Sequence, residues 1–179
     1  MLHQGKKQYL DYIKKAVLSG RNNYQNSIDT WKKNFDPQHV FGFSGPGNIP
    51  VQAHIEGFMF NITGEFEYAL WAKKCLLDVE QFKELYPKEK IGEHPEYEKG
   101  LPAIDALFGL QAYIYGYLFV KDSGFLTEQE KKQIENTIRR CIYTKLHFPE
   151  WGAHNRSMLA VWSLTLAAKA IEADQETAE

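Results

Sequence analysis

The chain has 179 residues, of which 44% are hydrophobic and 14% aromatic, and 21 Lys and Arg residues nearly balance 23 Asp and Glu residues. A net charge of −2 argues against a basic nucleic-acid-binding surface, and the apolar content suffices for one domain core, which excludes disorder for most of the chain. No run approaches the roughly 20 consecutive apolar residues that span a bilayer, and the N-terminal residues do not form a signal-peptide pattern.

Helical spacing of apolar residues recurs along the whole chain, whereas no segment shows the alternation of a half-buried strand. The sequence therefore predicts an all-α domain. In chain order, the expected helices are 6–19, 23–34, 50–62, 65–84, 101–121, 127–145 and 151–172. We expect the first two to form an antiparallel hairpin.

The later helices are of two kinds. Segments 65–84 and 127–145 carry one apolar stripe among charged residues, and Thr127 with Glu130 forms a capping box at the start of the second. These two helices should lie outside. Three segments are apolar around most of their circumference and should lie inside, with neighbours on several sides: 50–62, 101–120 and 151–171.

The order inner, outer, inner, outer, inner is typical of antiparallel hairpins in a two-layered solenoid or (α/α) toroid, and differs from a four-helix bundle. The longer loops that enter inner helices, 35–49 and 86–100, should meet at one end, which is the expected functional face. Residues 171–179 resemble 61–69, where an inner helix ends and an outer one begins. We therefore expect an incomplete toroid within one helical domain, with an apolar end that permits self-association.

The two cysteines, Cys75 and Cys141, lie alone within helical patterns. Neither has a second Cys or a His at metal-ligand spacing. We expect two buried free thiols, and the sequence indicates no metal site and no cofactor.

The strongest polar cluster is EWGAHNRS at 150–157, where a loop becomes an apolar helix. Successive helical residues are about 100° apart, so at most two of His154, Asn155 and Arg156 can reach one cavity. The start of a helix also favours an anion such as a carboxylate. The alternative is structural: His154 and Asn155 satisfy loop backbone groups, and Arg156 pairs with Glu150.

Three segments carry a resemblance to a known family: GFMFNITGEFEYALWAKKCLL, FLTEQEKKQIENTIRR and EWGAHNRSMLAVWSLTLAAKAI. Together they resemble the N-terminal helical toroid of the heparinase II/III and alginate lyase superfamily of polysaccharide lyases, over roughly residues 30 to 179. The resemblance implies cleavage of a uronic-acid-containing glycan by β-elimination, without a cofactor. It also implies an acidic polysaccharide as partner, and a periplasmic or secreted location if the parent protein is exported.

Carried onto this chain, the resemblance implies that Asn155 neutralises the substrate carboxylate with His154 as its companion, and that Arg156 contacts substrate. In these lyases the catalytic Tyr lies on a later toroid helix, and another catalytic His often comes from a following β-sandwich domain. The present chain has neither region, so we expect it to lack the full catalytic set.

Other residues are candidates for binding the glycan. Trp151 could stack on a sugar ring or be buried at an interface. Tyr113 and Tyr117 share a helix face by their i, i+4 spacing and could line a sugar cleft, although core packing is the commoner role of such residues. His54 and Gln52, which begin another inner helix, are secondary candidates.

Two other functions stay open from the sequence. A toroid-type glycoside hydrolase would use acidic residues within inner helices, Glu56 or Asp105, whose alternative role is a satisfied ion pair or a cap. A noncatalytic helical binding module would need neither the acidic residues Glu56 and Asp105 nor the cluster at 154–156.

Overall fold

A computed structural model describes residues 2–35, 47–85, 109–147 and 154–171. Within these ranges the chain is helical and contains no strand, which confirms the all-α prediction. None of these helices combines the length and the apolar character needed to cross a membrane. The elements are α1 (Leu2–Asn34), α2 (Asn48–Thr63), α3 (Phe66–Asp78), the 3-10 helix η1 (Val79–Leu85), α5 (Leu110–Val120), α6 (Glu128–His147) and α7 (His154–Ala170).

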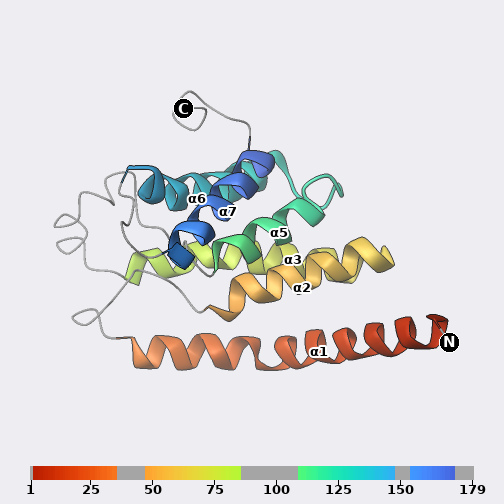
Figure 1. Ribbon diagram of the computed structural model, residues 1–179. Helices are drawn as coiled ribbons and strands as arrows, with labels where there is room; N and C mark the ends of the chain where they lie inside the picture. Colours follow the sequence, from red (N-terminus) through yellow and green to blue (C-terminus); the bar gives the residue numbers. More distant parts are fainter. Residues whose placement is uncertain (1, 36–46, 86–108, 148–153, 172–179) are drawn as a thin grey trace.

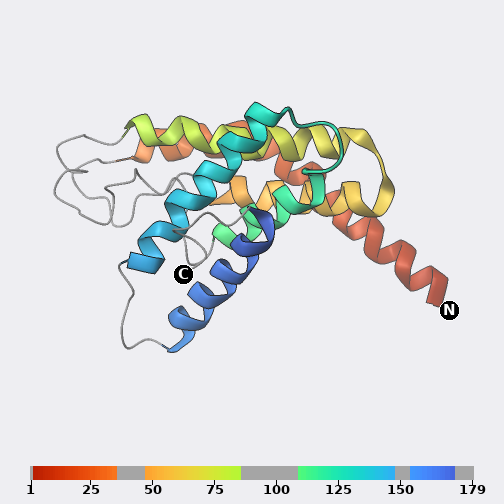
Figure 2. The same ribbon diagram turned by 90° about the horizontal axis from the view of Figure 1, so that it is seen from above.

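The helices pack in two layers (Figures 1 and 2). Helices α2, α5 and α7 lie side by side in an inner layer, and α3 and α6 lie against them in an outer layer. The inner helices run in one direction. His54 and then Phe58 of α2 lie beside Tyr115 and then Phe119 of α5. Gln111 at the start of α5 bonds to Leu159 of α7, and Lys121 after its end shares a pocket with Lys169. Solenoids and toroids share this order, so closure into a toroid stays a prediction.

The outer helices also run parallel to each other. Lys73 of α3 pairs with Glu130 near the start of α6, at 2.7 Å, and Glu80 of η1 pairs with Arg140 farther along α6. Parallel helices within each layer require that the N-terminal ends of α2, α5 and α7 lie at one end of the inner layer. The loops expected to meet there fall largely outside the described residues.

The predicted hairpin of helices 6–19 and 23–34 is wrong, because α1 is one continuous helix of 33 residues. Its buried stripe, Val17, Tyr24 and Ile28, runs through the expected break without interruption. Gly20 serves close packing at this point, since a Cβ there would lie 1.9 Å from Oε1 of Gln52 in α2. Gly20, which falls between the two expected helices, is therefore a contact position within one helix.

The predicted outer helix 65–84 also differs in part, since α3 ends at Asp78 and the chain continues as 3-10 helix. The buried residues of this stretch, Leu76, Val79 and Phe82, recur every third position. That spacing keeps them on one side of a 3-10 helix, whereas an α-helix would rotate them progressively away. Packing against the core thus favours the tighter helix here.

The start of α6 confirms the predicted capping box. The backbone N–H of Glu130 donates to Oγ1 of Thr127 at 3.2 Å, and the backbone N–H of Thr127 donates to Oε2 of Glu130 at 2.8 Å. These bonds satisfy two donors that the first turn of a helix leaves unpaired. The capping box therefore fixes the residue at which the short connection after α5 ends and α6 begins.

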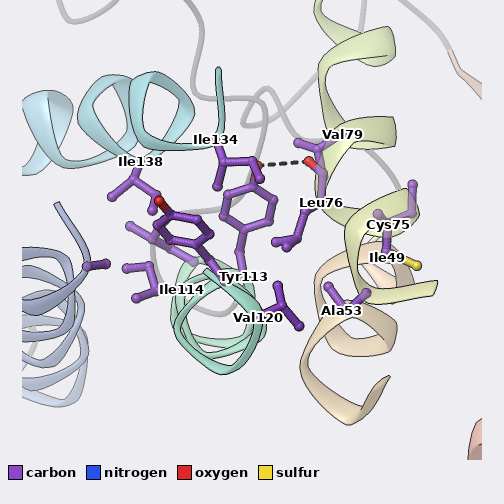
Figure 3. Close-up of a cluster of buried hydrophobic side chains, with 14 of the residues drawn as sticks. Ile49, Ala53, Cys75, Leu76, Val79, Tyr113, Ile114, Val120, Ile134 and Ile138 are labelled. Carbon is purple, nitrogen blue, oxygen red and sulfur yellow. Dashed lines mark hydrogen bonds between the residues drawn. The ribbon is translucent and has the colours of Figure 1, made fainter. Parts of the chain in front are cut away.

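The core lies between the layers and centres on α5 (Figure 3). Tyr113 rises from α5 between α3 and α6, beside Ile134 and Ile138, and its hydroxyl donates to the Leu76 carbonyl at 2.9 Å. Cys75 and Cys141 are both buried and form no disulfide, as predicted. This side of α5 is therefore fully occupied by packing against the outer layer.

Candidate functional site

The opposite side of the inner layer carries a continuous group of aromatic side chains, here called the aromatic band. Its members come from all three inner helices: His54 and Phe58 of α2, Tyr115 and Phe119 of α5, and Trp162 of α7. Tyr115 is two positions from Tyr113, or about 200° around the helix. It therefore faces away from the outer layer against which Tyr113 packs.

Ring contacts join the band from α2 to α7. The His54 ring is nearly parallel to Tyr115, at 17° and 5.2 Å between centroids, and to Phe119, at 13° and 6.1 Å. Phe58 meets Phe119 edge to face at 6.1 Å, and Trp162 meets Tyr115 in the same manner at 6.4 Å. These contacts fix the rings relative to one another in preferred geometries.

The band is accessible, because Trp162 is 48% exposed and the other four members are partly exposed. Exposed apolar side chains accompany it on the same two edge helices, Val51 on α2 and Met158 and Val161 on α7. Neighbouring exposed apolar and aromatic side chains of this kind commonly mark a site where a ligand or another molecule binds. Aromatic faces are suited to the C–H faces of sugar rings.

His54 supplies a polar group within the band. Partial burial lowers the pKa of His54, because removal from water disfavours the charged imidazolium. The ring is therefore neutral at pH 7, with one nitrogen as donor and the other as acceptor. A neutral imidazole offers a hydrogen bond to a sugar hydroxyl without placing a charge beside the rings of Tyr115 and Phe119.

The predicted catalytic cluster lies at the start of α7. Residues 154–156 form its first turn, and their side chains are outside the part of the structure that is described. Position 155 precedes Trp162 by seven residues, so the two positions share one side of the helix within about 20°. They are about 10 Å apart along its axis. Trp151 and Asp105 lie outside the described residues.

Three residues expected to contact substrate are instead buried elsewhere. Tyr113 and Tyr117 face the outer layer, where the Tyr117 hydroxyl donates to Oε1 of Glu135 at 2.7 Å. Gln52 is 5% exposed and donates to Oε1 of Glu56 at 2.8 Å. All three lie away from the aromatic band, so the expected cleft lined by Tyr113 and Tyr117 and the expected binding by Gln52 are not part of this candidate site. His54 is the predicted binding residue that the band contains.

Glu56, the hydrolase candidate, is a buried ion-pair residue. Its carboxylate is completely inaccessible and accepts hydrogen bonds from Nε and Nη2 of Arg21 at 2.6 and 2.7 Å. The guanidinium also lies over the rings of Tyr68 and Trp71 and pairs with Glu67. A carboxylate held in this way serves packing between α1 and α2 and is closed to substrate.

Sequence reasoning did not single out four members of the band: Phe58, Tyr115, Phe119 and Trp162. A signal exists in the i, i+4 pairs that each inner helix carries, His54 with Phe58, Tyr115 with Phe119, and Met158 with Trp162. Because these helices are apolar on nearly every side, the pattern does not tell which side remains open. The layer arrangement supplies that information.

Within the described ranges, no three His, Cys, Asp or Glu side chains gather at a point where they could hold a metal ion. No protein-family model, curated protein or solved structure significantly matches this chain. The case for a function therefore depends on the site and on the resemblance of the sequence segments.

Proposed function

We propose that this chain is part of a polysaccharide lyase and that the open face of its inner layer binds a uronic-acid-containing glycan. The observation that carries the proposal is the aromatic band, which crosses α2, α5 and α7. The toroid and the lyase activity themselves come from the resemblance of the sequence segments. The band adds an accessible surface of the chemistry that a glycan requires.

The band and the start of α7 have complementary roles in this proposal. The rings of Tyr115 and Trp162 pack against the C–H faces of sugars, while the first turn of α7 meets the carboxylate of one uronate residue. The positive end of the helix dipole favours an anion at that position. A ligand that contacts both Trp162 and position 155 must extend over about two helical turns, so the proposed ligand is an oligosaccharide.

In the proposed elimination, Asn155 and His154 donate hydrogen bonds to the uronate carboxylate. Neutralising this charge makes the C5 proton more acidic, and the same donors stabilise the enolate that develops as the proton leaves. A base removes the C5 proton, a C4–C5 double bond forms, and the C4–O bond breaks as the leaving oxygen gains a proton. We assign the carboxylate contacts to this chain and assign no base.

The hydrolase alternative had two candidate carboxylates, Glu56 and Asp105, and Glu56 is not accessible to substrate. Inverting hydrolysis needs a carboxylate that activates water, and retaining hydrolysis needs one that attacks the sugar. Glu56 is closed to both roles by its bonds to Arg21. A noncatalytic glycan-binding module would use the same band, and the presence or absence of turnover separates it from a lyase.

Turnover of a polyuronate by the full-length protein tests the lyase proposal. Elimination leaves a conjugated unsaturated uronate that absorbs ultraviolet light, whereas hydrolysis does not. We expect Asn155→Ala to abolish the rise in absorbance and to leave the thermal unfolding midpoint nearly unchanged. Asn26→Ala, at an exposed position on α1, is the matched control and should retain turnover. Full turnover by Asn155→Ala would refute the assignment.

A further inference from the structure

A second site lies on the other side of α5, where the inner helices end. A pocket of about 370 Å³ is enclosed by the C-terminal ends of α5 and α7 and by the first turns of α6. Its lining includes four lysines, Lys121, Lys131, Lys132 and Lys169, and three carboxylates, Asp122, Glu128 and Glu135. The aromatic band lies on the opposite side of α5, because Tyr117 lines this pocket and Tyr115 does not.

Two of the three carboxylates are already engaged. Glu128 pairs with Lys131 at 2.9 Å. Glu135 accepts the hydrogen bond of the Tyr117 hydroxyl and lies 3.9 Å from Arg139 on the same helix. Asp122 is the remaining carboxylate of the lining.

Lys131 has Glu128 as its partner, but the other three lysines of the lining have no carboxylate partner among the described residues. Among the described residues, no carboxylate lies within ion-pair distance of Lys121, Lys132 or Lys169. Lys121, Lys132 and Lys169 therefore share the pocket with Asp122 and with Glu135, whose charge the neutral Tyr117 hydroxyl does not cancel. Like charges held together repel one another, and a bound anion would relieve that repulsion.

Helix dipoles explain only part of this arrangement. Lys121 follows α5 and Lys169 lies in the last turn of α7, where the negative end of a helix favours a cation. Lys132 lies in the second turn of α6, where the helix end has little effect on a cation. The positive end of α6 adds to the field of the lysines. The helix ends thus do not account for the position of Lys132.

We propose that this pocket binds a phosphate or sulfate group through Lys121, Lys132 and Lys169. The four lysines outnumber the three carboxylates of the lining by one, which favours an anion, and the pocket volume leaves room for the molecule that carries the group. The proposal is independent of the glycan site, because it involves neither the aromatic band nor α7 residues 154–156.

Titration of the full-length protein with inorganic phosphate and with sulfate, at constant ionic strength set by chloride, tests the proposal. NMR shifts near Lys121 and Lys169 should saturate. We expect Lys169→Gln and Lys132→Gln each to weaken binding roughly fivefold, as loss of one exposed ion pair allows. Lys15→Gln, an exposed lysine on α1, should bind as wild type does. Tighter binding of sulfate than phosphate assigns a sulfate ester as ligand, and the reverse assigns a phosphate ester.

Absence of saturable shifts with both ions would overturn the proposal, as would undiminished binding in both variants. A purely dipole-stabilising role for Lys169 predicts a lower unfolding midpoint in Lys169→Gln by the same amount with and without phosphate. The proposal instead predicts that phosphate raises the midpoint of wild type more than that of the variant.

Discussion

The Glu56 carboxylate of α2 is fully buried and receives two hydrogen bonds from the Arg21 guanidinium of α1, at 2.6 and 2.7 Å. Arg21 is itself 9% exposed at its side chain. Charges removed from water in this manner are stable only as a pair, because each alone would bear the full cost of desolvation. The pair therefore anchors the long first helix to the inner layer.

Loss of Arg21 should be strongly destabilising. Arg21→Met leaves an uncompensated buried carboxylate, and we expect the free energy of unfolding to fall by about 3–5 kcal/mol. Adding Glu56→Met should recover much of this loss, since a buried ion pair can often be replaced by apolar residues of similar volume without loss of stability. Glu67→Gln, which removes an exposed partner of Arg21, should cost less than about 1 kcal/mol. Urea unfolding of the four proteins measures these values, and equal losses for Arg21→Met and Glu67→Gln would contradict the account.

The approach of α2 to α5 depends on Gly116. A Cβ at this position would lie 2.8 Å from the carbonyl carbon of Ala53, which forces two backbones apart. We expect Gly116→Ala to lower the free energy of unfolding by about 1–3 kcal/mol, despite the better helix propensity of alanine. Gly5→Ala in α1 is the control, because a Cβ there meets no atom within 4 Å. It should be neutral or slightly stabilising, and the same result for Gly116→Ala would show that the helices do not pack this closely.

The thiols should be protected in the native protein. Burial raises the pKa of Cys75 to about 12, and Cys141 is fully buried. Because the thiolate is the reactive form and access is blocked, neither thiol should react with a disulfide reagent at pH 8 until the protein unfolds. Counting modified thiols by mass spectrometry, with and without denaturant, checks this. Rapid reaction of Cys75 without denaturant would contradict its burial on α3.

The environment of His54 predicts a specific dependence on pH. Its pKa is lowered in the folded state by burial, so the unfolded chain binds its proton more readily. The stability contributed by neutral His54 is present above the unfolded pKa of about 6.5 and is lost as the pH falls through the folded pKa. We expect His54→Gln to lose less stability than wild type between pH 7 and pH 5. Parallel losses in the two proteins would mean that His54 is freely solvated.

The alternation of apolar and charged faces predicted the all-α class and several helix starts correctly. Helices α2, α6 and α7 begin within three residues of their expected starts, and Thr127 with Glu130 forms the expected cap. The division of α1 was wrong because Gly20, which falls between the two expected helices, lies within one continuous helix, where its lack of a side chain serves the contact with Gln52. Local pattern does not reveal which partner a glycine faces.

The site was less predictable for a related reason. Inner helices are apolar on nearly every side, so the sequence did not distinguish Tyr113, which packs into the core, from Tyr115, which lies in the band. The pairing of Glu56 with Arg21 joins residues 35 positions apart, and spacing along one helix cannot indicate it. Both distinctions depend on which helices become neighbours.

The affinity of an oligouronate for the full-length protein tests the central claim most directly. Calorimetric titration should show that Tyr115→Ala weakens binding by roughly two- to tenfold, since an aromatic contact contributes about 0.5–1.5 kcal/mol. Tyr115→Leu, which keeps apolar bulk, controls for loss of packing and should also bind more weakly. Tyr12→Ala, at a tyrosine 71% exposed on α1, should bind as wild type does. Equal affinity in all four proteins, or no binding to wild type, would contradict a glycan site at the aromatic band.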